Sequence, residues 1–340
     1  MATNSSHPPS GRQPDPAGSS PVVGVVGLGD MGAAIAAAVL QKFPLVAFDI
    51  RQVAVEKLAT AGARGARSVE EVAQLSDIVI VVVVDDRQVT EVVGQILGNP
   101  GRTRCIVISS TVLPGTCMSL AEQAKAVGLT VVDAPVSGGA EKAQQGIITV
   151  LVGGEDAAVE TCWPVLSSFG KDLFHLGPIG AGSAGKLITN LLTLGGNMLQ
   201  LEAMQFAAAH GITEDAVTAF LPLTTADSRG MRTWGRYDRM RRSHTLAGTP
   251  AMYDIFAKDM KVAAKAAGQR GVVLPIVSAI SAMIIEKAQA RDEYLAAQGP
   301  TDPIPRCRIC TLELAYPFRE AGMHPECALR SEERRVGKEC

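Results

Sequence analysis

The sequence predicts an α/β fold, with a doubly wound parallel sheet, followed by a separate all-α C-terminal domain. Short β-branched runs alternate with helical segments up to about residue 180, and strand signals then largely disappear. One run, residues 79–84, is apolar at every position, which is typical of a parallel strand buried on both faces. Strands that alternate with helices favour a sheet covered by helices on both sides.

Length and charge limit the class of protein. A chain of 340 residues can bury a sizeable core and form two domains. Its formal net charge is −2, which gives no indication of a nucleic-acid partner or of an anionic membrane surface. The apolar runs are shorter than the roughly 20 residues that span a bilayer, so no membrane segment is expected.

The N-terminal residues 1–20 are rich in Ser, Pro and Gly and have no hydrophobic stretch typical of a signal peptide. We therefore expect a disordered tail and a cytoplasmic protein. In a reducing compartment Cys105, Cys117 and Cys162 are expected to be free thiols.

The C-terminal segment 299–340 is set aside from the functional interpretation. Its last residues, 330–340, look like the conceptual translation of a sequencing-adapter oligonucleotide. The segment also contains Cys307-Arg-Ile-Cys310, but a second Cys-x-x-Cys pair is missing, so no metal site is expected.

The individual elements follow from the same patterns. We expect strands at residues 22–26, 45–48, 78–84, 105–109, 130–133 and 148–152, and helices at about 33–40, 68–75, 86–97, 116–127 and 156–168. A long helix is expected from about 183 to 210, with Gly211 as its stop signal. Because much of that helix is apolar around its circumference, it is expected in a core or a subunit interface.

The first strand runs into a Gly-x-Gly-x-x-Gly motif that precedes an alanine-rich helix, the context of a Rossmann dinucleotide site. Gly27 allows the tight turn, Gly29 the approach of a pyrophosphate, and Gly32 close packing of helix on strand. The alternative is a glycine-rich turn without a ligand. Asp49, which closes the second strand, favours NAD, whereas Arg51 could pair with the 2′-phosphate of NADP.

Two further places suggest a substrate site. Residues Ser137, Gly138 and Gly139 offer a hydroxyl and unobstructed backbone N–H groups, which suit a carboxylate. Lys186 and Asn190 are four residues apart on the long helix and share one face. The alternative for Lys186 is a lysine whose ammonium reaches solvent. Lys258 begins a later helix, either on a solvated face or near the cofactor.

The chain resembles the β-hydroxyacid dehydrogenase family, the group of 3-hydroxyisobutyrate dehydrogenase and tartronate semialdehyde reductase, with a 6-phosphogluconate dehydrogenase-type NAD-binding domain. The resemblance covers about residues 22–298 and rests on four motifs in the right order. They are Gly27-Leu-Gly-Asp-Met-Gly32, Asp133-Ala-Pro-Val-Ser-Gly-Gly139, Gly180-Ala-Gly-Ser-Ala-Gly-Lys-Leu-Ile-Thr-Asn190 and Lys258-Asp-Met.

This resemblance implies a Rossmann domain at 21–180, a helical substrate and oligomerisation domain at 181–298, and dimers or tetramers. It implies reversible hydride transfer between NAD(P) and a small β-hydroxy acid, such as 3-hydroxyisobutyrate, tartronate semialdehyde, glycerate or a sugar acid. Lys186 is implied as the catalytic lysine, Asn190 as its substrate-orienting partner, and the Ser137–Gly139 turn as the carboxylate site. The cofactor-binding set is Gly27, Leu28, Gly29, Met31, Gly32, Asp49, Arg51, Val84, Thr111 and Lys258.

Two alternatives remain from the residues alone. Imine reductases share the architecture, and a non-catalytic NAD-binding module has the same nucleotide motif. The walls around the rest of the substrate are expected from aromatic residues such as Trp234 and Tyr237, although core packing is the favoured interpretation of Trp234.

Overall fold

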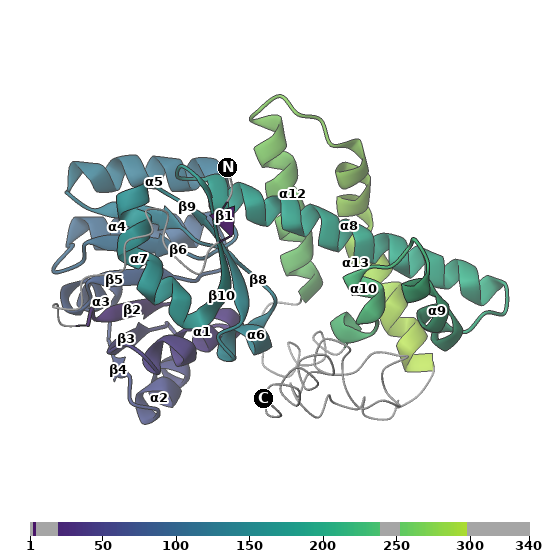
Figure 1. Ribbon diagram of the computed structural model, residues 1–340, viewed down its shortest axis with the longest axis horizontal. Helices are drawn as coiled ribbons and strands as arrows, with labels where there is room; N and C mark the ends of the chain where they lie inside the picture. The colour runs from purple at the N-terminus through teal and green to yellow at the C-terminus, as the bar shows by residue number, and fades with distance from the viewer. Residues whose placement is uncertain (1–2, 5–19, 239–251, 298–340) are drawn as a thin grey trace, which may run out of the picture. The chain divides into compact units, whose positions relative to one another are not determined.

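The structure, a computed structural model, describes residues 3–4, 20–238 and 252–297 (Figure 1). The chain divides into two compact units, residues 1–190 with 261–274, and residues 191–260 with 275–340. Most of the expected N-terminal tail, the segment 299–340 and the Cys307–Cys310 motif lie outside the described residues. Thr3 and Asn4, within the expected tail, form a two-residue strand.

A single sheet forms the centre of the first unit. Its strands are β1 (Thr3–Asn4), β2 (Val23–Val26), β3 (Leu45–Phe48), β4 (Arg64–Gly65), β5 (Ile78–Val81), β6 (Cys105–Ile108), β7 (Thr130–Asp133), β8 (Val136–Ser137), β9 (Ile148–Gly153) and β10 (Gly170–Gly177). Their order is β1-β10-β9-β7-β6-β5-β2-β3-β4, with β8 beside β9. Strands β2 to β7 pair in parallel, whereas β9 is antiparallel to β7. The order reverses between β2 and β5, where such folds bind ligands.

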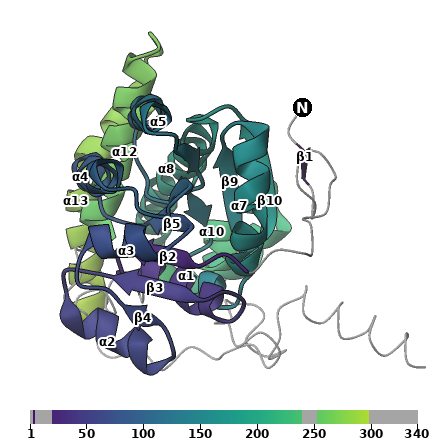
Figure 2. The same ribbon diagram turned by 90° about the vertical axis from the view of Figure 1, so that its left-hand side faces the viewer.

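Both faces of the sheet are buried, which explains the continuous apolar runs. In β5, Ile78 and Ile80 pack into one core cluster and Val79 and Val81 into the other. One face is covered by α1 (Asp30–Leu40), α2 (Gln52–Thr60) and α7 (Asp156–Phe169), and the other by α3 (Val69–Leu75), α4 (Asp86–Gly98) and α5 (Pro114–Ala126) (Figure 2). The predicted α/β fold with a mainly parallel sheet is confirmed.

Two details of the sheet differ from the sequence prediction. The strand expected at 78–84 ends at Val81. The Val82 N–H still donates to the Val26 carbonyl of β2 (2.9 Å), but the next two N–H groups bond to side chains. Val83 N–H donates to Ser110 Oγ (2.8 Å) and Val84 N–H to Gln88 Oε1 (2.9 Å). Strands β4, β8 and β10 were not expected, since their polar and glycine residues hide the period-2 pattern.

Helices make up the described part of the second unit. The long helix α8 (Ala181–Ala209) begins in the first unit and ends in the second, close to its predicted bounds. Gly211 follows it with φ +72°, as expected of a helix stop. The other helices are α9 (Glu214–Phe220), the 3₁₀ turn η1 (Leu221–Leu223), α10 (Arg229–Arg232), α12 (Met252–Gly268) and α13 (Pro275–Ala297).

A buried arginine joins three segments of the second unit. Arg291 of α13 is 7% exposed and pairs with Glu214 of α9 and with Asp238, at 3.0 Å from the Asp238 carboxylate. Its guanidinium also lies 5.0 Å from the centre of the Trp234 ring. Burial acts to raise the pKa of Glu214, but the hydrogen bonds from Arg291 and Trp234 outweigh it and hold that pKa below its usual value.

The two-sided burial of the sheet predicts a large effect of truncating its central strands. Ile80→Ala removes a fully buried side chain and is expected to lower the free energy of unfolding by about 2–5 kcal/mol. The same truncation at Ile50, which is 92% exposed, is expected to change it by less than about 0.5 kcal/mol. Urea unfolding of both variants tests this; equal losses would contradict the assigned burial.

Candidate functional site

The glycine-rich turn between β2 and α1 is shaped by backbone crowding. Gly27 has φ +93°, and a side chain there would overlap the carbonyl oxygen of Val82. A side chain at Gly32 would overlap the carbonyl oxygen of Gly27. The turn therefore packs tightly against α1 and against the chain that follows β5.

The N-terminus of α1 is open by contrast. Gly29 is its N-cap, and no side-chain hydrogen bond caps the helix. A Cβ at Gly29 would have no atom of the described residues within 4 Å. The first N–H groups of a helix lack intrahelical partners and carry the positive end of the helix dipole. An uncapped helix start beside open space fits the pyrophosphate of a dinucleotide.

Asp49 and Arg51 close one side of this turn. The Asp49 carboxylate accepts the Leu28 N–H (2.6 Å), the Arg51 N–H (2.8 Å) and Arg51 Nε (3.1 Å). Arg51 Nη2 donates to the Leu28 carbonyl (3.0 Å). Burial tends to raise the pKa of Asp49, but hydrogen bonds from Arg51 and Leu28 outweigh it and hold that pKa below its usual value. The acid and the base are thus joined to each other and to the turn.

The chain that follows β5 meets the chain that follows β6. Ser110, 3% exposed, accepts the Val83 N–H through its hydroxyl. Val84 is 45% exposed, and Thr111, directly after Ser110, is half-buried. Asp85 caps α4 by accepting the Gln88 N–H (2.8 Å).

Two acids that the sequence analysis did not assign organise the strand ends. Asp86 Oδ1 accepts the Leu113 N–H (3.0 Å) and the Thr116 hydroxyl (2.5 Å). Asp133, at the end of β7, accepts N–H groups from Gly180 (2.7 Å) and Ser183 (2.5 Å). Both acids lie close to the C-terminal end of a buried parallel strand, which was the available signal for them.

The Ser-Gly-Gly turn begins at the end of β8, a short strand that the sequence analysis did not predict. Gly138 has φ +143° and Gly139 φ +88°, a backbone that L side chains rarely adopt. Ser137 is half-buried at the end of β8 and pairs with Thr149 of β9. The turn therefore presents its backbone without side chains at two successive positions, as the carboxylate hypothesis requires.

Lys186 and Asn190 lie on α8, in its second and third turns. Lys186 is half-buried, and Asn190 is 7% exposed. Close packing fixes this part of the helix, because a side chain at Gly185 would overlap Leu176 of β10. The first unit thus contains every residue assigned to catalysis, to the carboxylate turn or to the cofactor except Lys258.

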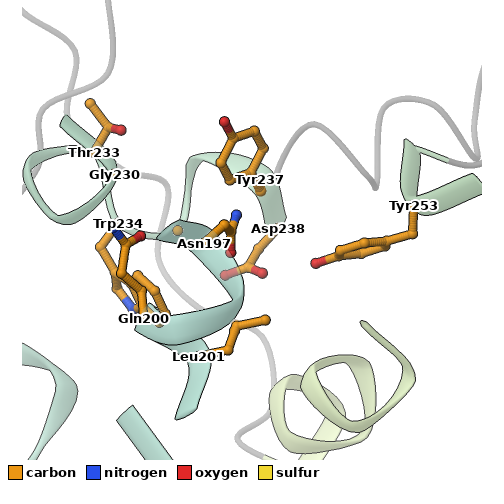
Figure 3. A pocket seen from close by; sticks show the side chains of 10 residues that line it. Asn197, Gln200, Leu201, Gly230, Thr233, Trp234, Tyr237, Asp238 and Tyr253 are labelled. Carbon is orange, nitrogen blue, oxygen red and sulfur yellow. The ribbon is translucent and has the colours of Figure 1, made fainter. Parts of the chain in front are cut away.

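Lys258 lies on α12, in the second unit, and its Nζ is 2.8 Å from the Asp259 carboxylate. The same unit contains a pocket that Trp234 and Tyr237 line together with Asn197, Gln200 and Asp238 (Figure 3). Trp234 also packs in the core and donates from Nε1 to Glu214 (2.7 Å). Trp234 therefore lines this pocket and also packs in the core.

Within the described residues, no group of three or more His, Cys, Asp or Glu side chains could hold a metal ion. Helices long and apolar enough to cross a bilayer are likewise missing from this part of the chain.

Two family models match successive parts of the chain. Residues 22–177 match the family model of the NAD-binding domain of 6-phosphogluconate dehydrogenase. Residues 180–301 match the NAD-binding model of NADP-dependent 3-hydroxyisobutyrate dehydrogenase. The 2-(hydroxymethyl)glutarate dehydrogenase of Eubacterium barkeri is 33% identical over 79% of this chain and 89% of its own. The chain belongs to the β-hydroxyacid dehydrogenase family.

Solved structures of this family have the same fold. A 3-hydroxyisobutyrate dehydrogenase from Salmonella typhimurium has a TM-score of 0.66 and 31% identity, over 79% of this chain and 94% of its own. The Mycobacterium tuberculosis 3-hydroxyisobutyrate dehydrogenase with L-serine has a TM-score of 0.69 at 22% identity, over 80% and 94%. Imine reductases share the fold at 19–21% identity. As a β-hydroxyacid dehydrogenase, the chain is an oxidoreductase that uses NAD or NADP.

Because the start of α1 is open, a substitution there can weaken cofactor binding without destabilising the fold. Gly29→Ala places a methyl group where the protein has no atom, so folding is expected to be unchanged while NADH binding weakens by about tenfold or more. Gly32→Ala overlaps the Gly27 carbonyl and is expected to lower the melting temperature as well. Fluorescence titration with NADH and a thermal melt measure the two effects. Unchanged NADH affinity in Gly29→Ala would argue against a dinucleotide at this turn.

Proposed function

We propose that this enzyme catalyses reversible hydride transfer between a nicotinamide and the hydroxyl-bearing carbon of a small β-hydroxy acid, with Lys186 as the general acid and base. One observation carries the proposal: a single compact unit contains an uncapped dinucleotide turn, a Ser-Gly-Gly turn, and a lysine–asparagine pair on one helix face. The first turn suits cofactor binding, the second suits the substrate carboxylate, and the lysine–asparagine pair suits substrate orientation and proton transfer.

Cofactor binding is assigned to the turn Gly27–Gly32 with Leu28 and Met31, to Asp49 and Arg51, and to Val84 and Thr111 at the next two strand ends. Lys258 would contact the cofactor from the helical domain. When bound, the nicotinamide supplies the acceptor or donor of hydride. We propose NAD as the preferred cofactor, because the low pKa of Asp49 keeps a negative charge where NADP carries a 2′-phosphate. Arg51 is already paired with Asp49.

Ser137, Gly138 and Gly139 would hold the substrate carboxylate through the serine hydroxyl and backbone N–H groups. These hydrogen bonds would fix one end of the substrate, so that the hydroxyl-bearing carbon faces the nicotinamide. Asn190, which is buried, would orient the substrate hydroxyl through its amide. Lys186 Nζ would take the hydroxyl proton in oxidation and return it in reduction.

We further propose a division of labour between a nucleotide domain at residues 21–180 and a helical domain at 181–298. The compartment proposed is the cytoplasm. Cys105 and Cys162 are buried free thiols whose Sγ atoms lie 3.0 Å apart, and a reducing compartment would keep this pair from forming a disulfide.

Replacing the lysine tests the mechanism. In Lys186→Ala, kcat is expected to fall by about 10²–10⁴-fold, the usual contribution of a general acid–base group. NADH binding should persist, because no cofactor contact is removed. Steady-state assays with 3-hydroxyisobutyrate, 2-(hydroxymethyl)glutarate and glycerate measure this, with NADH fluorescence as the binding readout.

Lys171→Ala is the matched control, because Lys171 is an exposed lysine of the same unit, on β10. It should leave kcat unchanged. Wild-type turnover by Lys186→Ala would remove the lysine from the mechanism. Reduction of a cyclic imine with NADPH, without turnover of any hydroxy acid, would favour the imine reductase alternative.

Homo-oligomers through the helical domain, a dimer or a tetramer, are the quaternary structure we propose. An exposed apolar stripe along α8 supports it, formed by Ile188 (59% exposed), Leu192 (75%), Leu199 (63%) and Phe206 (68%). Three of these residues follow one another at a spacing of seven, so they lie on one helix face. Monomeric proteins rarely expose continuous apolar surface of this kind.

A charge in this stripe should break the oligomer. Leu192→Asp is expected to shift the protein toward the monomer in light scattering coupled to size-exclusion chromatography, because an unpaired carboxylate would be buried in the interface. Ala208→Asp puts the same charge at an exposed position near the end of α8, on the side of the helix opposite the stripe, and should leave the mass unchanged. A wild-type protein that is itself monomeric at micromolar concentration would contradict the proposal.

A further inference from the structure

Asp133 connects the sheet to the start of α8. It is the last residue of β7 and has no exposed surface. Its Oδ1 accepts the Gly180 N–H (2.7 Å) and its Oδ2 the Ser183 N–H (2.5 Å). In most helices, the side chain of the helix's own N-cap residue accepts hydrogen bonds from the first-turn N–H groups. Here the cap comes from a strand that is 50 positions away in the sequence.

The backbone around this carboxylate leaves little room for movement. A side chain at Gly153 of β9 would overlap Asp133 Oδ1, and one at Gly182 of α8 would come within 2.6 Å of the Asp133 carbonyl oxygen. On the other side of the helix start, the Ser183 hydroxyl lies 3.4 Å from Cys117 Sγ of α5. Three elements therefore hold the first turn of α8 in one position.

Asp133 is connected to both parts of the proposed substrate site, the carboxylate turn at Ser137 and Lys186 on α8. Along the chain, Asp133 precedes the carboxylate turn at Ser137 by four residues. Through its side chain it holds Ser183, which precedes Lys186 by less than one helical turn. One buried residue thus sets where the carboxylate turn leaves the sheet and where the lysine helix begins.

We infer that Asp133 is a positioning residue, which fixes Lys186 relative to the carboxylate turn at Ser137 by capping the first turn of α8. The inference rests on the proposed function for the roles of Lys186 and Ser137. Because displacement of a catalytic group by about 1 Å can lower a rate by about 10²-fold, loss of this cap affects catalysis without removing any group that touches the substrate.

Asp133→Asn is the decisive variant. It keeps the shape of the side chain, but an NH₂ group replaces one of the two oxygens that accept N–H groups. We expect kcat to fall by about 10–100-fold, with unchanged affinity for NADH. The isotope effect on kcat from deuterium at the transferred position of the reduced cofactor should rise, because misplacing the lysine slows the chemical step. A smaller fraction of folded enzyme would not change that ratio.

Asp77→Asn is the matched control. Asp77 also accepts a backbone N–H, from Val22 (2.8 Å), and pairs with Arg102, but it lies before β5, at the opposite end of the sheet strands. Its loss is expected to lower the melting temperature and to leave kcat and the isotope effect at wild-type values.

A second readout needs no substrate. The rate at which acetic anhydride acylates Lys186, followed by mass spectrometry, should rise several-fold in Asp133→Asn, whereas acylation of Lys171 stays constant. Unchanged acylation of Lys186 would overturn the inference. So would altered acylation with wild-type kcat and isotope effect.

If the wild-type enzyme turns over no hydroxy acid, the proposed function fails, and the acylation rates alone decide whether Asp133 holds Lys186 in place. If Asp133→Asn does not fold, Ser183→Pro removes the donor instead of the acceptor. Proline is tolerated in the first turn of a helix. The same rise in Lys186 acylation is then expected, and its absence would overturn the inference.

Discussion

The hydrogen bonds from the start of α8 to Asp133 tie the long helix to the sheet. Burying a carboxylate is unfavourable unless its oxygens are satisfied, and here the two backbone N–H groups of Gly180 and Ser183 satisfy them. Desolvation raises the pKa of Asp133, with these hydrogen bonds acting in the opposite direction. The helix that bears Lys186 and Asn190 therefore has a defined origin on the sheet, and the other assigned groups of the first unit are arranged around that same edge.

The central strands supply this rigidity. Because β5 and β6 are buried on both faces, their ends cannot move without disrupting two core clusters. Polar side chains lie at or just after the strand ends, at Asp49, Ser110 and Asp133. Each binds backbone groups of a neighbouring segment. The same few residues thus stabilise the strand ends and fix the segments that carry the proposed site residues.

Fold and cofactor class could be predicted from the sequence because they depend on local patterns. Alternation of apolar runs identified the sheet, and Gly27–Gly32 identified the nucleotide turn. Strand β10 was missed because Lys171, Asp172 and His175 interrupt its apolar pattern. The roles of Asp86 and Asp133 were missed for another reason. Their partners are tens of residues away, so only the folded chain shows which N–H groups they accept.

The segment with Thr111 is held at both of its ends. Ser110 binds the chain after β5, and the Leu113 N–H binds Asp86 at the start of α4. A segment with fixed ends has few backbone conformations to lose when a ligand packs against it, so association there carries a small entropic penalty. A ligand that fits this segment can therefore bind without waiting for a loop to rearrange, so such a step does not limit its association rate.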